Sequence, residues 1–243
     1  LESIGDFLAI GIGVNLAHAP GADQVEAGAL RPVSVVAETG KVVPPEVFLD
    51  ALAAETGCRA LPFDVTEEES VRDALDDLDL WGVVNCAGFG GEIATPMDTD
   101  IDVFDKVISI NTRGALLVTK YASRSMIRLK QGGAIVNVSS QAGLVALKGH
   151  ISYGSSKAAL DTMGKSLARV LGPQIRVIGV SPAAVATDFV PGRGREGVEK
   201  QAASTPLQRV CEPDDVGLAI LSAITHLRLS TGTTIVVDSG RHL

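Results

Sequence analysis

The chain has 243 residues, of which 46% are hydrophobic and 21% charged, and its mean hydropathy is +0.27. This length suits one large domain or two small ones, and the composition argues against a disordered chain. With 21 basic against 29 acidic residues the formal charge is −8, which disfavours sequence-independent binding to nucleic acid or to an anionic membrane.

The cysteines point to a reducing compartment. Cys58, Cys86 and Cys211 are odd in number and far apart, so they show neither zinc-ligand spacing nor a disulfide framework, and a cytoplasmic location is expected. Residues 1–9 lack a basic region and no run approaches about 18 apolar residues, so neither a signal peptide nor a membrane span is expected. The four histidines are scattered, which argues against a metal site.

From residue 33 onward, short runs rich in β-branched residues alternate with helical patterns. The sequence predicts strands at residues 33–38, 59–65, 81–86, 134–139, 175–180 and 233–237. It predicts helices at residues 45–56, 67–77, 98–130 (as one helix or two), 152–171 and 213–224. Thr66 is the expected N-cap of the second of these helices, whose first turn is acidic.

The predicted strands are apolar without a two-residue alternation, which indicates burial on both faces. Alternating strands and helices therefore predict an α/β fold, with a doubly wound parallel sheet and helices on both faces, in a single domain over residues 1–243. Such sheets bind ligands beyond the carboxyl ends of their strands. The segments in which to seek a site are therefore residues 85–88, 111, 139–143 and 181–189.

Tyr153 and Lys157 are four residues apart on one predicted helix, so both side chains project from the same face. A neighbouring ammonium favours a phenolate, so we expect Lys157 to lower the pKa of Tyr153 from about 10 toward the working pH, as proton transfer requires. Ser140 follows the preceding strand, and its hydroxyl is expected to face the phenol. The alternatives are an ordinary surface pair and a serine that only forms a turn.

Five motifs, in this order along the chain, resemble those of the classical short-chain dehydrogenases/reductases. They are N-C-A-G at residues 85–88, N-T-R-G at 111–114, a strand ending in Ser140 followed by Y-G-S-S-K at 153–157, S-P-A-A-V-A-T at 181–187, and V-D-S-G at 237–240. The resemblance covers about residues 58–243. It implies a single Rossmann-like domain that binds NAD or NADP.

Carried over by position, the resemblance implies catalytic roles for four residues. Tyr153 would be the general acid in reduction and the general base in oxidation, while Lys157 would lower the pKa of the phenol and hold the nicotinamide ribose. Ser140 would bind the substrate carbonyl or hydroxyl group. Asn111 would hold a water molecule in the proton relay to Lys157.

The same resemblance implies a cofactor site along the strand ends. Its members are Asp64, Val65, Asn85, Ala87, Gly88, Tyr153, Lys157, Pro182 and Thr187. Glu38, at the end of a predicted strand, would accept hydrogen bonds from an adenosine ribose and so favours NAD over NADP. A surface glutamate is an equal alternative.

The first 32 residues depart from the family pattern. Gly11 and Gly13 match the last G-x-G of the phosphate-binding glycine loop, but Asp6 and Phe7 stand where threonine and glycine belong, and Leu16 where a further glycine belongs. An ordinary glycine turn explains Gly11 and Gly13 equally well.

A small, mostly apolar substrate pocket is expected around Ser140, Gln141, Leu144, Leu147, Tyr153, Ala184 and Phe189. The sequence thus predicts an NAD(P)-dependent oxidoreductase that interconverts a secondary alcohol and a ketone on a small or medium substrate, as a homodimer or homotetramer. Two alternatives stay open. One is a cofactor-impaired binding or assembly subunit, motivated by the altered glycine loop, and the other is a lyase or epimerase that uses the same tyrosine.

Overall fold

A computed structural model describes residues 8–10, 63–130, 132–187, 189–190 and 193–243. The strand and helix expected at residues 33–38 and 45–56 lie outside these ranges, as do Gly11, Gly13 and Glu38. Most of the strand expected at residues 59–65 also lies outside them, and residues 63–65 form a loop and turn rather than a strand.

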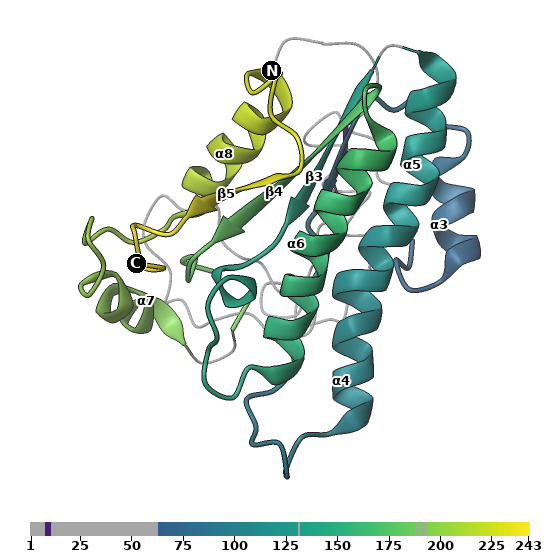
Figure 1. The fold of residues 1–243 in the computed structure, drawn as a ribbon. Coiled ribbons are helices and arrows are strands. Elements are labelled where there is room, and N and C mark those ends of the chain that lie inside the picture. Colours follow the sequence, from purple (N-terminus) through teal and green to yellow (C-terminus); the bar gives the residue numbers. More distant parts are fainter. Residues whose placement is uncertain (1–7, 11–62, 131, 188, 191–192) are drawn as a thin grey trace, which may run out of the picture.

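The described part of the chain forms one sheet of five parallel strands (Figure 1). In sheet order these are β1 (Leu8–Ile10), β2 (Gly82–Asn85), β3 (Gly133–Val138), β4 (Ile175–Pro182) and β5 (Thr233–Val237). Every neighbouring pair is parallel, which confirms the parallel α/β sheet that the apolar strands predicted. Sequence analysis did not predict β1, whose residues pair with β2 from Leu8 opposite Gly82 to Ile10 opposite Val84.

Helices lie between the strands in chain order. They are α3 (Glu68–Leu75), α4 (Ile101–Ile108), the π-helix η2 (Ser109–Gly114), α5 (Ala115–Leu129), the 3₁₀-helix η3 (Gln141–Gly143), α6 (Ile151–Leu171), α7 (Gly194–Ala202) and α8 (Pro213–Thr225). Within the described ranges, no helix is both long and apolar enough to cross a bilayer.

Two helix starts differ from the expectations. Helix α3 has Glu67 rather than Thr66 as its N-cap, because the Thr66 hydroxyl instead donates a 2.7 Å hydrogen bond to the Asp64 carboxylate and closes a turn. Helix α4 begins only after Asp100, whose carboxylate accepts hydrogen bonds from two backbone N–H groups of the first turn. The segment expected as one helix or two is therefore two α-helices joined by η2.

Helix α7 was not expected. Its sequence, G-R-E-G-V-E-K-Q-A, contains two glycines and one large apolar residue, so neither helix propensity nor apolar periodicity predicts it. That apolar residue, Val198, is buried, and an ion pair joins Arg195 to Glu199 one turn later. Tertiary packing therefore decides the conformation of this segment.

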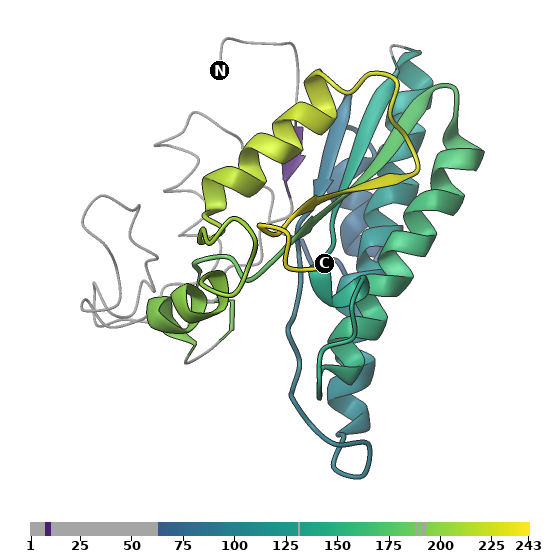
Figure 2. The ribbon, with the colours of Figure 1, turned by 60° about the vertical axis from the view of Figure 1, so that its left-hand side comes forward.

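Helices cover both faces of the sheet (Figures 1 and 2). On one face α3, α5 and α6 pack on the strands through an apolar cluster that includes Met126, Ile135 and Val177. On the other face α8 packs on a second cluster that includes Val136 and Ile178. Consecutive strand residues thus enter opposite apolar layers, which confirms the expected burial on both faces.

Substitutions of Met126 and Ile127, which are consecutive residues of α5, test the packing of the first apolar layer. Met126 is 0% exposed, whereas Ile127 is 50% exposed. We expect Met126→Ala to lower the free energy of unfolding by about 2–5 kcal/mol, because it leaves a cavity in the core. Ile127→Ala should cost much less, and denaturant unfolding measures both. Equal losses for the two variants would contradict the described packing.

Candidate active site

The carboxyl ends of the strands bring the expected catalytic residues to one edge of the sheet. Ser140 follows β3 after a single intervening residue. Tyr153 and Lys157 lie on the first two turns of α6, and Asn111 lies in η2. The contacts of each residue show how the fold holds them together.

The Lys157 side chain reaches from α6 to the end of β3. Its Nζ donates a 2.8 Å hydrogen bond to the Val138 carbonyl oxygen, and only 4% of the residue is exposed. Burial lowers the pKa of this ammonium to about 8, while negative charge at Cys86 and Asp161 raises it. An ammonium has three N–H groups, so this bond leaves two for other partners.

The Tyr153 ring lies beside that ammonium, with Nζ 5.8 Å from the ring centroid. We expected Lys157 to lower the pKa of the phenol toward the working pH, whereas the net shift is upward and Lys157 is not among its causes. Burial raises the pKa, because a phenolate is poorly solvated there. A hydrogen bond with the Ser140 hydroxyl and the positive charge of Arg193 act in the opposite direction and are the smaller influences. The Ser140 hydroxyl therefore lies near enough to the phenol to influence its pKa.

Ser140 is held by the turn that follows β3. Its Oγ accepts a 3.1 Å hydrogen bond from the Ala142 N–H group, so the hydroxyl proton stays available to another acceptor. Of the expected substrate residues in this turn, Gln141 is buried and Leu144 is exposed. The turn therefore orients the serine while presenting an apolar side chain to the surface.

Asn111 fixes the loop after β2 against α6. Its Oδ1 accepts a hydrogen bond from the Phe89 N–H group at 2.7 Å, and its Nδ2 donates to the Phe89 carbonyl oxygen and to the Ser156 hydroxyl, each at 3.0 Å. Both amide hydrogens thus bond protein atoms, and the water molecule expected at Asn111 remains a prediction. Asn111 lies in the π-helix η2, a widened turn that is frequent at functional sites.

Ser156 is a positioning residue that sequence analysis missed. It is completely buried, and its hydroxyl donates a 2.8 Å hydrogen bond to the Tyr153 carbonyl oxygen while it accepts from Asn111. It thereby connects the backbone of the tyrosine to the loop after β2. The only signal in the sequence is its place directly before Lys157.

Among the expected cofactor residues, Gly88 borders the ammonium. A Cβ atom at this position would lie 3.6 Å from Asn111 Oδ1 and 3.7 Å from Lys157 Nζ. Position 88 therefore lies beside the Lys157 ammonium, and a glycine places no side chain against it. Ala87 precedes it in the same loop.

The side chain of Asn85, which was expected to line the cofactor cleft, lies between the sheet and α5. Its Nδ2 donates a 2.8 Å hydrogen bond to Asn137 Oδ1, directly opposite on β3, and a 3.3 Å bond to the Thr119 hydroxyl on α5. Both asparagines are buried. This side chain therefore ties together the ends of β2 and β3.

The remaining expected cofactor residues lie in loops and at a strand end. Asp64 and Val65 precede α3, and Val65 packs against the backbone position of Gly114. Pro182 is buried at the end of β4, and Thr187 is exposed in the loop beyond it.

That loop also supplies the expected substrate residues Ala184 and Phe189. The Phe189 ring packs on the Tyr153 ring, with centroids 5.9 Å apart and planes tilted by 49°. Ala184 is partly buried. The loop after β4 thus places an aromatic ring beside the phenol ring of Tyr153.

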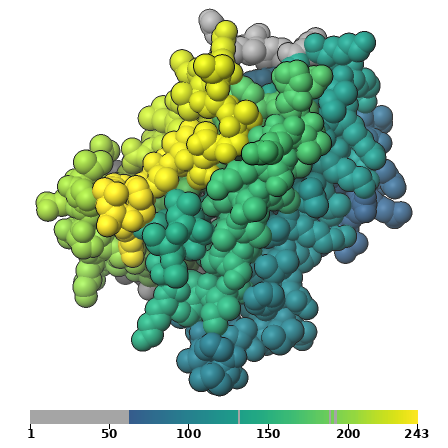
Figure 3. Space-filling view, viewed as in Figure 1, coloured from purple at the N-terminus to yellow at the C-terminus, as the bar shows by residue number. Residues whose placement is uncertain are grey.

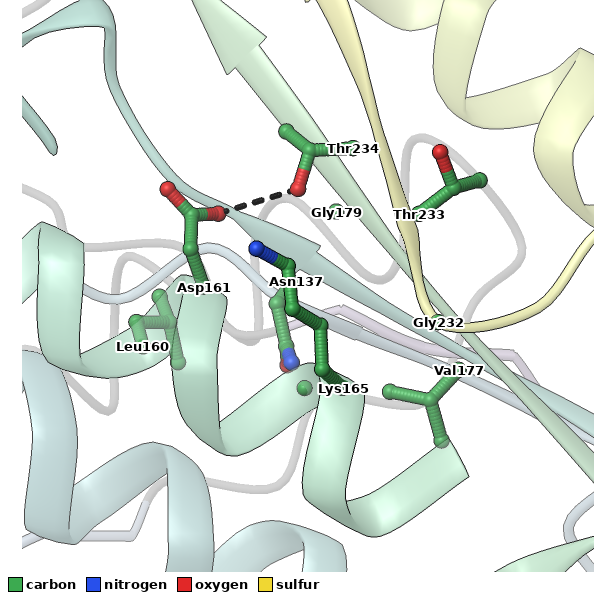
Figure 4. A pocket seen from close by; sticks show the side chains of 10 residues that line it. Asn137, Leu160, Asp161, Lys165, Val177, Gly179, Gly232, Thr233 and Thr234 are labelled. Carbon is green, nitrogen blue, oxygen red and sulfur yellow. Dashed lines mark hydrogen bonds between the residues drawn. The ribbon is translucent and has the colours of Figure 1, made fainter. Parts of the chain in front are cut away.

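A partly buried carboxylate lies one helical turn beyond Lys157. Asp161 Oδ1 accepts a 3.2 Å hydrogen bond from the Thr234 hydroxyl, which joins α6 to β5 (Figure 4). Asp161 lines a small hollow between α6 and strands β4 and β5, on the face where α6 and β5 lie side by side (Figure 3). Burial raises the pKa of this carboxyl group, and hydrogen bonds with Ser139 and Thr234 lower it. No sequence pattern singled out this residue.

Comparison with known proteins identifies the family. A family profile described as enoyl-(acyl carrier protein) reductase matches residues 35–242. The L-xylulose reductase of Caenorhabditis elegans is 35% identical over 185 residues, which cover 73% of this chain and 72% of that protein. Carbonyl reductase family member 4 of Xenopus tropicalis is 34% identical over 200 residues, covering 79% and 82%. A short-chain type dehydrogenase/reductase from Mycobacterium ulcerans has a TM-score of 0.75 at 28% identity, covering 82% of this chain and 78% of that one.

The chain therefore belongs to the classical short-chain dehydrogenase/reductase family, a family of oxidoreductases. Reductases of this family generally use NADH or NADPH. The described residues fit such a cofactor, because a buried ammonium, two of whose N–H groups bond none of them, lies beside Gly88, which carries no side chain. Lys157 and Tyr153 would hold the nicotinamide ribose there, beside Gly88.

Two substitutions of Gly88 test this fit. The added methyl group of Gly88→Ala would make only ordinary contacts, so the dissociation constant for NADH or NADPH should stay within about threefold of the original. Gly88→Leu would push carbon atoms into the space before Lys157 and should weaken binding by at least about tenfold. Titration by nucleotide fluorescence measures both constants. Equal binding by both variants would place the nucleotide elsewhere.

Proposed function

We propose that this protein is an NAD(P)-dependent oxidoreductase that interconverts a secondary alcohol and a ketone on a small or medium substrate, with Tyr153 as general acid and base. The observation that carries the proposal is the gathering of Ser140, Tyr153 and Lys157 at one edge of the sheet, with the buried ammonium 5.8 Å from the centroid of the phenol ring. Two hydroxyl groups and a cation at one point suit a carbonyl oxygen that gains a proton.

In the direction of reduction, the Ser140 hydroxyl donates a hydrogen bond to the carbonyl oxygen and holds it beside the phenol. NADH or NADPH, when bound, supplies the hydride. Tyr153 gives its proton to the oxygen as the oxygen becomes more basic. The positive charge of Arg193 stabilises the resulting phenolate, and the Lys157 ammonium lies beside its ring.

The proposal extends to assembly and location. We propose a homodimer or homotetramer in the cytoplasm, acting on a small carbonyl or alcohol compound. Cys86 and Cys211 are free thiols, which is consistent with a reducing compartment.

Tyr153→Phe removes the proton donor while keeping the ring that packs on Phe189. We expect kcat/KM for carbonyl reduction to fall by about 100- to 10,000-fold, with nucleotide binding little changed. Tyr121→Phe is the matched control, because Tyr121 lies on α5 and its hydroxyl donates to Glu68. Initial rates of NADH or NADPH oxidation measure the effect.

Three outcomes would contradict this role. Undiminished turnover by Tyr153→Phe would show that another group transfers the proton. A wild-type protein without saturable NADH or NADPH binding would favour a binding or assembly subunit. Products formed without net oxidation or reduction would indicate a lyase or epimerase.

The pH dependence should report the charge of Lys157. This ammonium is charged below its pKa of about 8 and loses its charge as the pH rises through that value, so kcat/KM for reduction should fall above about pH 8. The Asp161 carboxylate raises this pKa, so Asp161→Asn should move the fall to lower pH. While Lys157 is charged, alcohol oxidation should instead increase with pH, because it needs the Tyr153 phenolate.

Asp102→Asn is the control for this profile. Asp102 is exposed on α4, so its neutralisation should leave the pH of half-maximal rate unchanged. An identical profile for Asp161→Asn and wild type would show that the alkaline fall does not come from Lys157.

A further inference from the structure

A half-buried arginine without a carboxylate partner lies in the loop that follows β4. Arg193 directly precedes α7, and its Nη2 donates a 2.7 Å hydrogen bond to the Val185 carbonyl oxygen. Its Nε is buried and has no hydrogen-bond partner. Among the residues that the structure describes, no aspartate or glutamate lies within ion-pair distance of this guanidinium.

Arg193 differs in this respect from the next arginine along the chain. Arg195 forms ion pairs with Glu199 and Glu212. In a chain of net charge −8 acidic side chains are plentiful, so a partly buried guanidinium that pairs with none of the described ones needs another explanation. Burial lowers the pKa of Arg193, as desolvation of a charge does, yet an arginine stays protonated. The buried Nε is the part of this cation that neither water nor an acceptor among the described residues compensates.

The position of Arg193 connects it to the reacting group. Its positive charge lowers the pKa of the Tyr153 phenol, and Phe189 from the same loop packs on the Tyr153 ring. Arg241 contributes a second positive charge nearby, and its side chain is bonded to Gln201 on α7. The loop after β4 therefore places the Arg193 guanidinium and the Phe189 ring close to the Tyr153 phenol.

We propose that Arg193 binds an anionic group, a carboxylate or a phosphate, on the carbonyl substrate. The inference rests on the proposed function, which places the carbonyl oxygen at Tyr153. With one N–H group of the guanidinium fixed on Val185, the remaining ones form a planar fork that matches two oxygens of such a group. The substrate is then a ketone with a charged group a few bonds from the carbonyl, either an oxo acid or a phosphorylated ketone.

Matched pairs of ketones test this assignment on the full-length protein. Acetoacetate and its ethyl ester share one ketone, and dihydroxyacetone phosphate and dihydroxyacetone share another. The ratio of kcat/KM within a pair isolates the charged group, because any effect on Tyr153 changes both members alike. Wild type should prefer the anionic member of at least one pair.

Substitution of Arg193 should abolish that preference. Arg193→Gln should lower the ratio by at least about tenfold, the change expected for a lost charge-assisted contact. Arg193→Lys should restore part of it, because it returns the charge without the fork. Arg195→Gln is the matched control and should keep the ratio. An equal ratio in wild type and Arg193→Gln would overturn the inference.

Calorimetric titration with the same ketones in the presence of NAD⁺ separates this inference from the proposed function. An anionic ketone that binds wild type at least about tenfold more tightly than Arg193→Gln, without turnover of any ketone, would leave the anion site standing and refute the oxidoreductase. Binding without preference for either anionic member, or no binding, would overturn the anion site whatever the turnover.

NADH titration identifies the source of the anionic group. An unchanged dissociation constant for NADH in Arg193→Gln supports a group on the substrate. A constant raised by about tenfold, with the ketone ratio unchanged, would assign Arg193 to the diphosphate of the nucleotide and overturn the substrate assignment.

Discussion

The hydrogen bond from the Lys157 ammonium to the Val138 carbonyl oxygen is the constraint on which the rest of the site depends. It fixes the second turn of α6 on the end of β3, and so brings Tyr153, one turn earlier, to the serine that follows that strand. A buried ammonium is stable only if it keeps partners, and the strand carbonyl and the carboxylate of Asp161 supply part of what it needs. The two other N–H groups of the ammonium bond none of the described residues, so they can bind a ligand beside Gly88.

Most of the sheet could be predicted from the sequence. The runs that form β2 to β5 are contiguous and apolar, and their packing between two helical layers is what such runs require. Strand β1 has three residues, too few for a pattern, and it exists through pairing with β2. Helix α7 and the π-helix η2 depend on tertiary contacts that no local sequence pattern encodes. In α7 these are the contacts of the buried Val198, and in η2 the hydrogen bonds of Asn111.

The candidate site, like the sheet, has residues that the sequence predicts and residues that it does not. Ser140, Tyr153 and Lys157 carry a spacing that places them at one edge, so the sequence was sufficient to find them. The direction of the Tyr153 pKa shift was not predictable, because it depends on how deeply the ring is buried. Ser156 and Arg193 match no sequence motif. Ser156 matters through its hydrogen bond with Asn111, which is distant in the sequence. Arg193 matters because its buried Nε has no hydrogen-bond partner among the described residues.

The bond between Asn85 and Asn137 has a consequence for how the sheet can assemble. Both amides lie on the layer under α5 and α6, whereas Val84 and Val136 enter the layer under α8. Slippage of either strand by one residue would drive an amide into hydrocarbon beneath α8 and break the hydrogen bond between the two asparagines. This one polar pair therefore raises the free energy of any sheet in which β2 and β3 are misaligned.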